Sequence, residues 1–99
     1  MALDYAHEKA DDLTEQTLEL RRAIASMIEE FEAATWYQER VDACKDPELK
    51  AILAHNRDEE KEHAAMLLEW IRRNDWVQAK ELKDYMFTDK PITSIEEDA

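Results

Sequence analysis

The 99-residue sequence has no glycine, two prolines and a single cysteine. Rossmann and P-loop phosphate sites are built on glycine-rich turns, so the lack of glycine excludes nucleotide binding by those routes. Tight β-hairpins also depend on glycine, which argues against a sheet-rich fold. Because Cys44 has no partner cysteine in the chain, it cannot form an internal disulfide, and a lone thiol is typical of a reducing compartment.

Long apolar runs and positive charge are also scarce. No stretch approaches the ~20 apolar residues that span a bilayer, and the acidic start MALDYAHEKADD lacks the apolar segment of a signal peptide. Thirteen Lys and Arg against 25 Asp and Glu give a formal net charge of −12. Such a chain repels phosphate backbones and anionic lipids but suits cations, so we expect no nucleic acid partner, no membrane partner and a cytoplasmic location.

The residues that are abundant favour helices, since Ala, Leu, Glu, Lys, Gln, Arg and Met are all good helix formers. The pair Asp46-Pro47 is typical of a helix start, with the aspartate as N-cap and the proline in the first turn. We expect a break at Asn74-Asp75, and Pro91 is expected to end regular structure. The predicted helices run from about Asp12 to Ala43, from Pro47 to about Arg73, and from Trp76 to about Phe87.

Two long helices joined by a short turn form an antiparallel hairpin, here followed by a shorter C-terminal helix. A hairpin cannot cover its own apolar stripe on all sides, and a chain this short buries only a modest share of its surface. The sequence therefore predicts an all-α fold in which a second copy completes a four-helix bundle. It is expected to be a single domain over residues 1–99, flexible at residues 1–11 and 92–99.

The second long helix carries two polar residues in the middle of its apolar face. At roughly 100° per residue, Glu60 and His63 point in the same direction as a set of mostly apolar residues. That set consists of Leu49, Ile52, Leu53, Asn56, Ala64, Leu67, Trp70 and Ile71. An ionised carboxylate there is costly unless it is paired, protonated or bound to metal. Because Glu60 and His63 are three positions apart, both side chains can meet one ion.

The first long helix carries a matching carboxylate. Glu30 lies at the edge of the apolar stripe, and Ala33 and Ala34 allow another helix to approach closely. Di-iron carboxylate bundles take one Glu from each of two helices and a Glu-x-x-His pair from each of two others. One chain therefore holds half a set, and two chains supply four carboxylates and two imidazoles. These donors favour iron, with manganese or zinc as competitors.

Several of the candidate residues also have simpler interpretations. Glu-x-x-His pairs occur by chance in acidic helices, and His55, which projects off the apolar face, is predicted to be a surface residue. Tyr37 either packs against its neighbours or lies over the metal. Glu29 and Glu32 either belong to a solvated face or attract cations toward the site. Trp36, on that same side, indicates a second protein–protein surface.

Three segments together resemble the encapsulated ferritins, short two-helix members of the ferritin-like group that are packaged inside encapsulin nanocompartments. The segments are MIEEFEAATWYQERVDAC, DPELKAILAHNRDEEKEHAAMLLEWIRRND and YMFTDKPIT, and the resemblance covers roughly residues 13–93. The resemblance implies a ferritin-like fold and a ferroxidase whose di-iron site forms between two subunits. It implies these ligands in each chain: Glu30, Glu60 and His63.

The resemblance also implies roles around that centre. Glu29 and Glu32 match a secondary, entry-type metal site, while Trp36 and Tyr37 flank the centre, which makes Tyr37 a candidate catalytic residue. The expected metal is iron, with calcium, zinc or manganese as substitutes. The expected partners are further copies of the chain, arranged as a decameric ring of dimers, and the encapsulin shell protein.

Three functions remain in competition at this point. The leading hypothesis is a ferroxidase that uses O₂ or peroxide and delivers Fe(III) for storage in a nanocompartment. A rubrerythrin-like di-iron peroxidase is the second, although the chain has no Cys-x-x-Cys electron donor. The third is a metal-free helical module that dimerises, which leaves Glu60 and His63 on the apolar face without an explanation.

Overall fold

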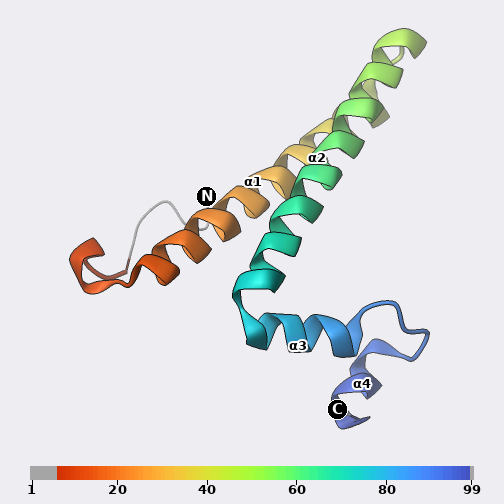
Figure 1. The fold of residues 1–99 in the computed structure, drawn as a ribbon. Helices are drawn as coiled ribbons and strands as arrows, with labels where there is room; N and C mark the ends of the chain where they lie inside the picture. Colours follow the sequence, from red (N-terminus) through yellow and green to blue (C-terminus); the bar gives the residue numbers. More distant parts are fainter. Residues whose placement is uncertain (1–6, 99) are drawn as a thin grey trace.

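The computed structural model describes residues 7–98, which are helical and contain no strand (Figure 1). A short 3-10 turn, η1 (Ala10–Asp12), precedes two long helices, α1 (Glu15–Ala43) and α2 (Pro47–Asn74). Two shorter helices follow, α3 (Trp76–Tyr85) and α4 (Ile92–Asp98). The all-α prediction is confirmed, and no helix over the described residues is both long and apolar enough to cross a bilayer.

The two long helices form the predicted hairpin, and α1 and α2 lie side by side along most of their length (Figure 1). The Asp46 carboxylate accepts a hydrogen bond from the Leu49 amide at 2.8 Å, which confirms the predicted start of α2. Helix α1 begins later than expected, because the Thr14 hydroxyl caps it by accepting from the Thr17 amide at 3.1 Å. Residues 10–12 form η1 instead, and Leu13 separates it from α1 in extended backbone.

A sharp change of direction separates α2 from α3. Asp75 has extended backbone, with φ −142° and ψ 99°, and its side chain accepts hydrogen bonds from the Val77 and Gln78 amides at 3.1 Å each. The predicted break is therefore confirmed, and α3 turns away from the axis of the hairpin (Figure 1). Helix α3 ends at Tyr85, before the expected Phe87, whose φ of 59° is left-handed and incompatible with a continuing α-helix.

The prediction that regular structure ends at Pro91 was wrong, because α4 follows it directly. The carbonyl of Pro91 accepts hydrogen bonds from the Ser94 amide at 3.0 Å and the Ser94 hydroxyl at 2.7 Å. Proline lacks only an amide proton that the first turn of a helix does not use, so it starts a helix as readily as it stops one. Ile95 is 4% exposed and is the only residue of α4 counted as buried among those whose side chains are described.

The core of the hairpin is thin and consists mostly of small side chains. The buried residues of α1 and α2 are Ala23, Ala34, Val41, Ala64 and Ile71. Large apolar side chains on the same two helices are more than a third exposed, namely Ile24, Phe31, Trp36, Leu49, Ile52, Met66 and Trp70. The radius of gyration is 17.3 Å, against about 13 Å for a compact domain of this length. The isolated chain therefore leaves much of its apolar surface uncovered.

The C-terminal helix offers a direct test of its packing. Ile95→Ala should abolish most of the hydrogen-exchange protection of residues 92–98, because a buried Ile→Ala change costs about 2–5 kcal/mol, more than a short helix can lose. Ile92→Ala is the matched control, since Ile92 lies in the same helix but is 73% exposed. Equal loss of protection in both variants, measured by exchange mass spectrometry, would show that Ile95 does not hold α4 in place.

Candidate metal centre

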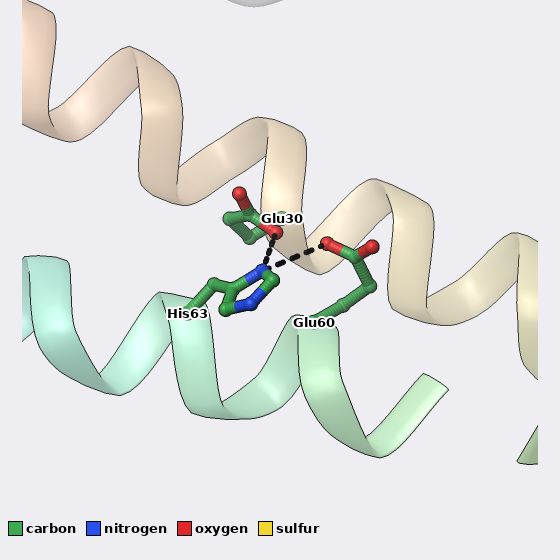
Figure 2. A group of neighbouring side chains, drawn as sticks. All are labelled: Glu30, Glu60 and His63. Atoms are coloured by element: carbon green, nitrogen blue, oxygen red, sulfur yellow. Dashed lines mark hydrogen bonds and ion pairs between the residues drawn. The ribbon is translucent and has the colours of Figure 1, made fainter. Parts of the chain in front are cut away.

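Three side chains from the two long helices meet where α1 and α2 run side by side (Figure 2). Glu30 comes from α1, and Glu60 and His63 come from α2. His63 Nδ1 lies 3.3 Å from Glu30 Oε2 and 3.6 Å from Glu60 Oε2. One potential ligand atom from each residue falls within 4.8 Å of the others. Over residues 7–98, this is the one group of three or more such side chains that lies close enough to share an ion.

Helix geometry explains why these three groups meet. Residues three apart lie on the same face of an α-helix, so Glu60 and His63 both point toward α1 (Figure 2). Small residues stand beside them on both helices, with Ala34 at 6% exposure on α1 and Ala64 at 2% on α2. A larger side chain at either alanine would push the helices apart and move Glu30 away from the other two.

The Glu30 carboxylate changes the protonation equilibrium of Glu60. The neighbouring Glu30 raises the pKa of Glu60 through a side-chain hydrogen bond, with desolvation and charge repulsion adding to the effect. Partial burial lowers the pKa of His63, but the hydrogen bond to Glu30 and the charges of Glu30, Glu60 and Glu59 together outweigh it and raise that pKa above its usual value. The site therefore holds excess negative charge that a proton or a metal cation relieves.

The donor set fits a metal ion of intermediate hardness. The donors are two carboxylates and one imidazole. Their side chains are partly exposed, with exposed fractions of 25% for Glu30, 22% for Glu60 and 42% for His63, so an ion from solvent can reach them. Carboxylate oxygen with imidazole nitrogen suits iron, manganese and zinc. Three protein donors are half of the set that a di-metal carboxylate bundle uses.

The other predicted site residues do not join this group. Glu29 is exposed and Glu32 is half-buried, and neither belongs to a cluster of potential ligands over the described residues. Trp36 is 52% exposed. The ring of Tyr37 is half-buried, and the guanidinium carbon of Arg40 lies 5.3 Å from its centroid. The functional roles of these residues therefore remain predictions.

Two more residues lie next to the group: His55, which is exposed as predicted, and Glu59, which the sequence pattern alone did not single out. The Glu59 carboxylate lies between two imidazoles, with Oε1 3.4 Å from His55 Nε2 and Oε2 3.8 Å from His63 Nε2. The signal was present in the sequence, because His55, Glu59 and His63 follow one another at intervals of four residues. That spacing places the three side chains in one row along a helix.

A helical hairpin with one glutamate on one helix and a Glu-x-x-His pair on the other matches half of the donor arrangement found in di-metal carboxylate bundles. This defines the class to which the fold and the site point. The EncFtn-like family model matches residues 5–89, and the chain therefore belongs to the EncFtn-like family. The encapsulated ferritin resemblance and the ferritin-like fold class predicted from the sequence are both confirmed.

Individual relatives agree with the family. An encapsulated ferritin-like protein from Rhodospirillum rubrum is 62% identical over 90 residues, covering 91% of this chain and 64% of that protein. The encapsulin nanocompartment cargo protein EncC from Myxococcus xanthus is 43% identical over 77 residues, covering 77% of this chain and 59% of EncC. The chain thus spans less than two-thirds of the length of these two curated relatives.

A solved structure shows the same fold. The crystal structure of protein ne0167 from Nitrosomonas europaea superposes on this chain with a TM-score of 0.84 and 64% sequence identity. The match covers 90% of this chain and 98% of that one.

The charge coupling in the site can be measured in metal-free protein. Glu30→Gln should lower the pKa of His63, because it removes the carboxylate that hydrogen bonds to Nδ1. A histidine pKa that is higher in the folded than in the unfolded protein stabilises the fold fully at pH values below the unfolded pKa of about 6.5. This stabilisation is lost as the pH rises through the folded-state pKa. NMR titration of the His63 imidazole gives the shift directly. Glu39→Gln, an exposed change on the same helix, is the control, and an unchanged His63 pKa in Glu30→Gln would contradict the coupling.

Proposed function

We propose that this protein is a ferroxidase, which oxidises Fe(II) to Fe(III) at a di-iron centre that two chains build together. The observation that carries the proposal is the group of Glu30, Glu60 and His63, with ligand atoms within 4.8 Å of one another across two helices. Membership of the EncFtn-like family supports it, as does the ferritin-like name of the Rhodospirillum rubrum relative.

The proposal that two chains share the centre has two supports in the structure. Each chain supplies two carboxylates and one imidazole, half of the donors that two iron ions need in such bundles. The face that carries these donors also includes Leu49 and Ile52, which are 48% and 52% exposed in the single chain. A second hairpin on that face would cover the apolar side chains and bring the missing donors.

The chemistry assigns a role to each group. With O₂ as the oxidant, two Fe(II) substrate ions each give up one electron. O₂ accepts these two electrons together with two protons and becomes hydrogen peroxide. The carboxylates of Glu30 and Glu60 stabilise the higher charge of Fe(III), because anionic oxygen favours the harder ion. His63 binds iron only through a nitrogen with a free lone pair, and the carboxylates that raise its pKa favour a proton there, so protons and iron would compete for the imidazole.

Residues outside the group complete the proposal. Glu29 and Glu32 would form an entry site that attracts cations on their way in, since each adds negative charge to the first helix. Trp36 and Tyr37 would flank the centre once a second chain is in place, and Tyr37 would be a candidate catalytic residue. Calcium, zinc or manganese would be able to occupy the same donors.

A nanocompartment is the proposed setting. Two relatives are called an encapsulated ferritin-like protein and an encapsulin nanocompartment cargo protein. We therefore propose that the encapsulin shell protein is a partner of this chain, that the protein works inside a cytoplasmic encapsulin compartment, and that Fe(III) is stored there. The proposed assembly is a decameric ring of dimers.

Iron should bind only between chains, and it should drive assembly. Repulsion between the copies of Glu30 and Glu60 opposes pairing, and a cation bound only by the paired form favours that form by mass action. Native mass spectrometry of protein titrated with Fe(II) should show dimers and larger rings that carry one iron ion per chain, with none on monomers. A verified monomer that holds iron stoichiometrically would overturn the shared centre.

Loss of a ligand should abolish most of the activity. Glu60→Ala and His63→Ala should each lower the rate of Fe(III) formation by more than about 100-fold, because each removes two ligands from a two-chain centre and even indirect partners of a metal cost 10–100-fold. Absorbance of Fe(III) follows the reaction, and circular dichroism checks the fold.

Two other variants separate direct from indirect effects in the same assay. Glu32→Ala should give a milder loss that changes with salt concentration, because the proposed role of Glu32 is electrostatic attraction. Glu39→Ala, an exposed carboxylate on the same helix, should keep the wild-type rate. Folded His63→Ala protein that oxidises iron as fast as wild type would refute the ferroxidase proposal.

A further inference from the structure

His55, Glu59 and His63 form a row of side chains on α2 that ends at the candidate metal centre. His55 is 69% exposed by side chain, Glu59 43% and His63 42%. Each oxygen of Glu59 faces one imidazole, at 3.4 Å from His55 Nε2 and 3.8 Å from His63 Nε2. Within residues 7–98, the ion-pair partners of Glu59 are these two histidines.

The two nitrogens of His63 face opposite kinds of neighbour. Nδ1 faces Glu30 and Glu60, at 3.3 Å and 3.6 Å, and is therefore the nitrogen that can share an ion with them. Nε2 faces Glu59. A neutral imidazole carries one proton, and a nitrogen that carries it has no lone pair for a metal. For Nδ1 to bind, the proton must reside on Nε2.

The carboxylates of the centre work against that arrangement. In the absence of metal, Glu30 and Glu60 both stabilise a proton on Nδ1, which is the nitrogen that has to be free. A group on the far side of the ring is needed to hold the proton on Nε2. Histidines that bind metals commonly donate their second N–H to a carboxylate, which fixes both the tautomer and the ring orientation. The Oε2 atom of Glu59 is placed to accept it.

We propose that Glu59 is a positioning residue for His63. It accepts the Nε2–H proton and keeps the Nδ1 lone pair directed at Glu30 and Glu60. The separation of 3.8 Å is an ion-pair distance rather than a hydrogen bond. A small rotation about the bonds of this half-exposed side chain would bring the oxygen within hydrogen-bond distance, and exposed side chains make such rotations readily. The other oxygen lies 3.4 Å from His55 Nε2.

This inference rests on the proposed function, because it requires that Glu30, Glu60 and His63 bind an ion. The probe is Zn²⁺, which is redox-inert and suits the same donors. Isothermal titration calorimetry of the full chain should show that Glu59→Ala weakens Zn²⁺ binding by about 10–100-fold without changing the number of ions bound. Glu59→Gln should retain part of the affinity, because the amide oxygen still accepts a hydrogen bond.

A spectroscopic signature distinguishes positioning from a general loss of charge. In Zn²⁺-loaded wild type, NMR should show the His63 Nε2–H proton downfield and slow to exchange with water. In Glu59→Ala that signal should move upfield or vanish through fast exchange. Glu62→Ala is the matched control, since it removes one exposed carboxylate on the same helix and should leave both the signal and the affinity as in wild type.

The outcomes separate this inference from the proposed function. The positioning role would be overturned if Glu59→Ala and Glu62→Ala bound Zn²⁺ with equal affinity and the Nε2–H signal were unchanged. The metal centre itself would then still stand. Loss of one bound ion per chain in Glu59→Ala would also overturn it, because Glu59 would then be a ligand of a separate site with His55. Wild-type protein that binds no Zn²⁺, or His63→Ala protein that binds it equally well, would refute the metal centre itself.

Discussion

The close approach of Glu30 and Glu60 is the constraint on which the rest of the structure depends. The Glu30 carboxylate raises the pKa of Glu60, so negative charge is concentrated at this part of the hairpin, and a proton or a cation relieves it. The alanines at positions 34 and 64 permit this approach, because side chains of their size let the two helices pack closely. The same alanines bury little apolar surface. The hairpin therefore has a thin core, and negative charge is concentrated at Glu30 and Glu60.

The proposed function relates the small core of the hairpin to its set of three potential ligands. A chain of this length has too little buried apolar surface to be very stable alone, and its large apolar side chains remain on the open faces of α1 and α2. Helix α3 turns away at Asp75 instead of folding back along the hairpin, and this leaves those faces uncovered (Figure 1). In the proposed function, a second hairpin supplies both the missing cover and the missing donors, so metal binding and assembly are linked.

Electrostatics also organises the surroundings of the centre. Glu59 stands between His55 and His63, and it faces the imidazole nitrogen that does not point at Glu30. The row therefore has carboxylate and imidazole in alternation, from the solvent to the junction of α1 and α2. Alternation of this kind places a carboxylate on each side of the His63 ring. In the proposed function, the ring would bind an ion on one side while its proton stays on the other.

The sequence by itself determined the helices and most of the site. The absence of glycine and the Asp46-Pro47 pair fixed an all-helical hairpin, and the three-residue spacing placed Glu60 and His63 on one face, because these signals are local. Only the tertiary structure decided which atoms face each other, such as His63 Nδ1 toward Glu30, since that depends on how closely two helices pack. It also decided that a helix follows Pro91, because a proline is compatible with either end of a helix, and the burial of Ile95 that accompanies α4 depends on contacts beyond the local sequence.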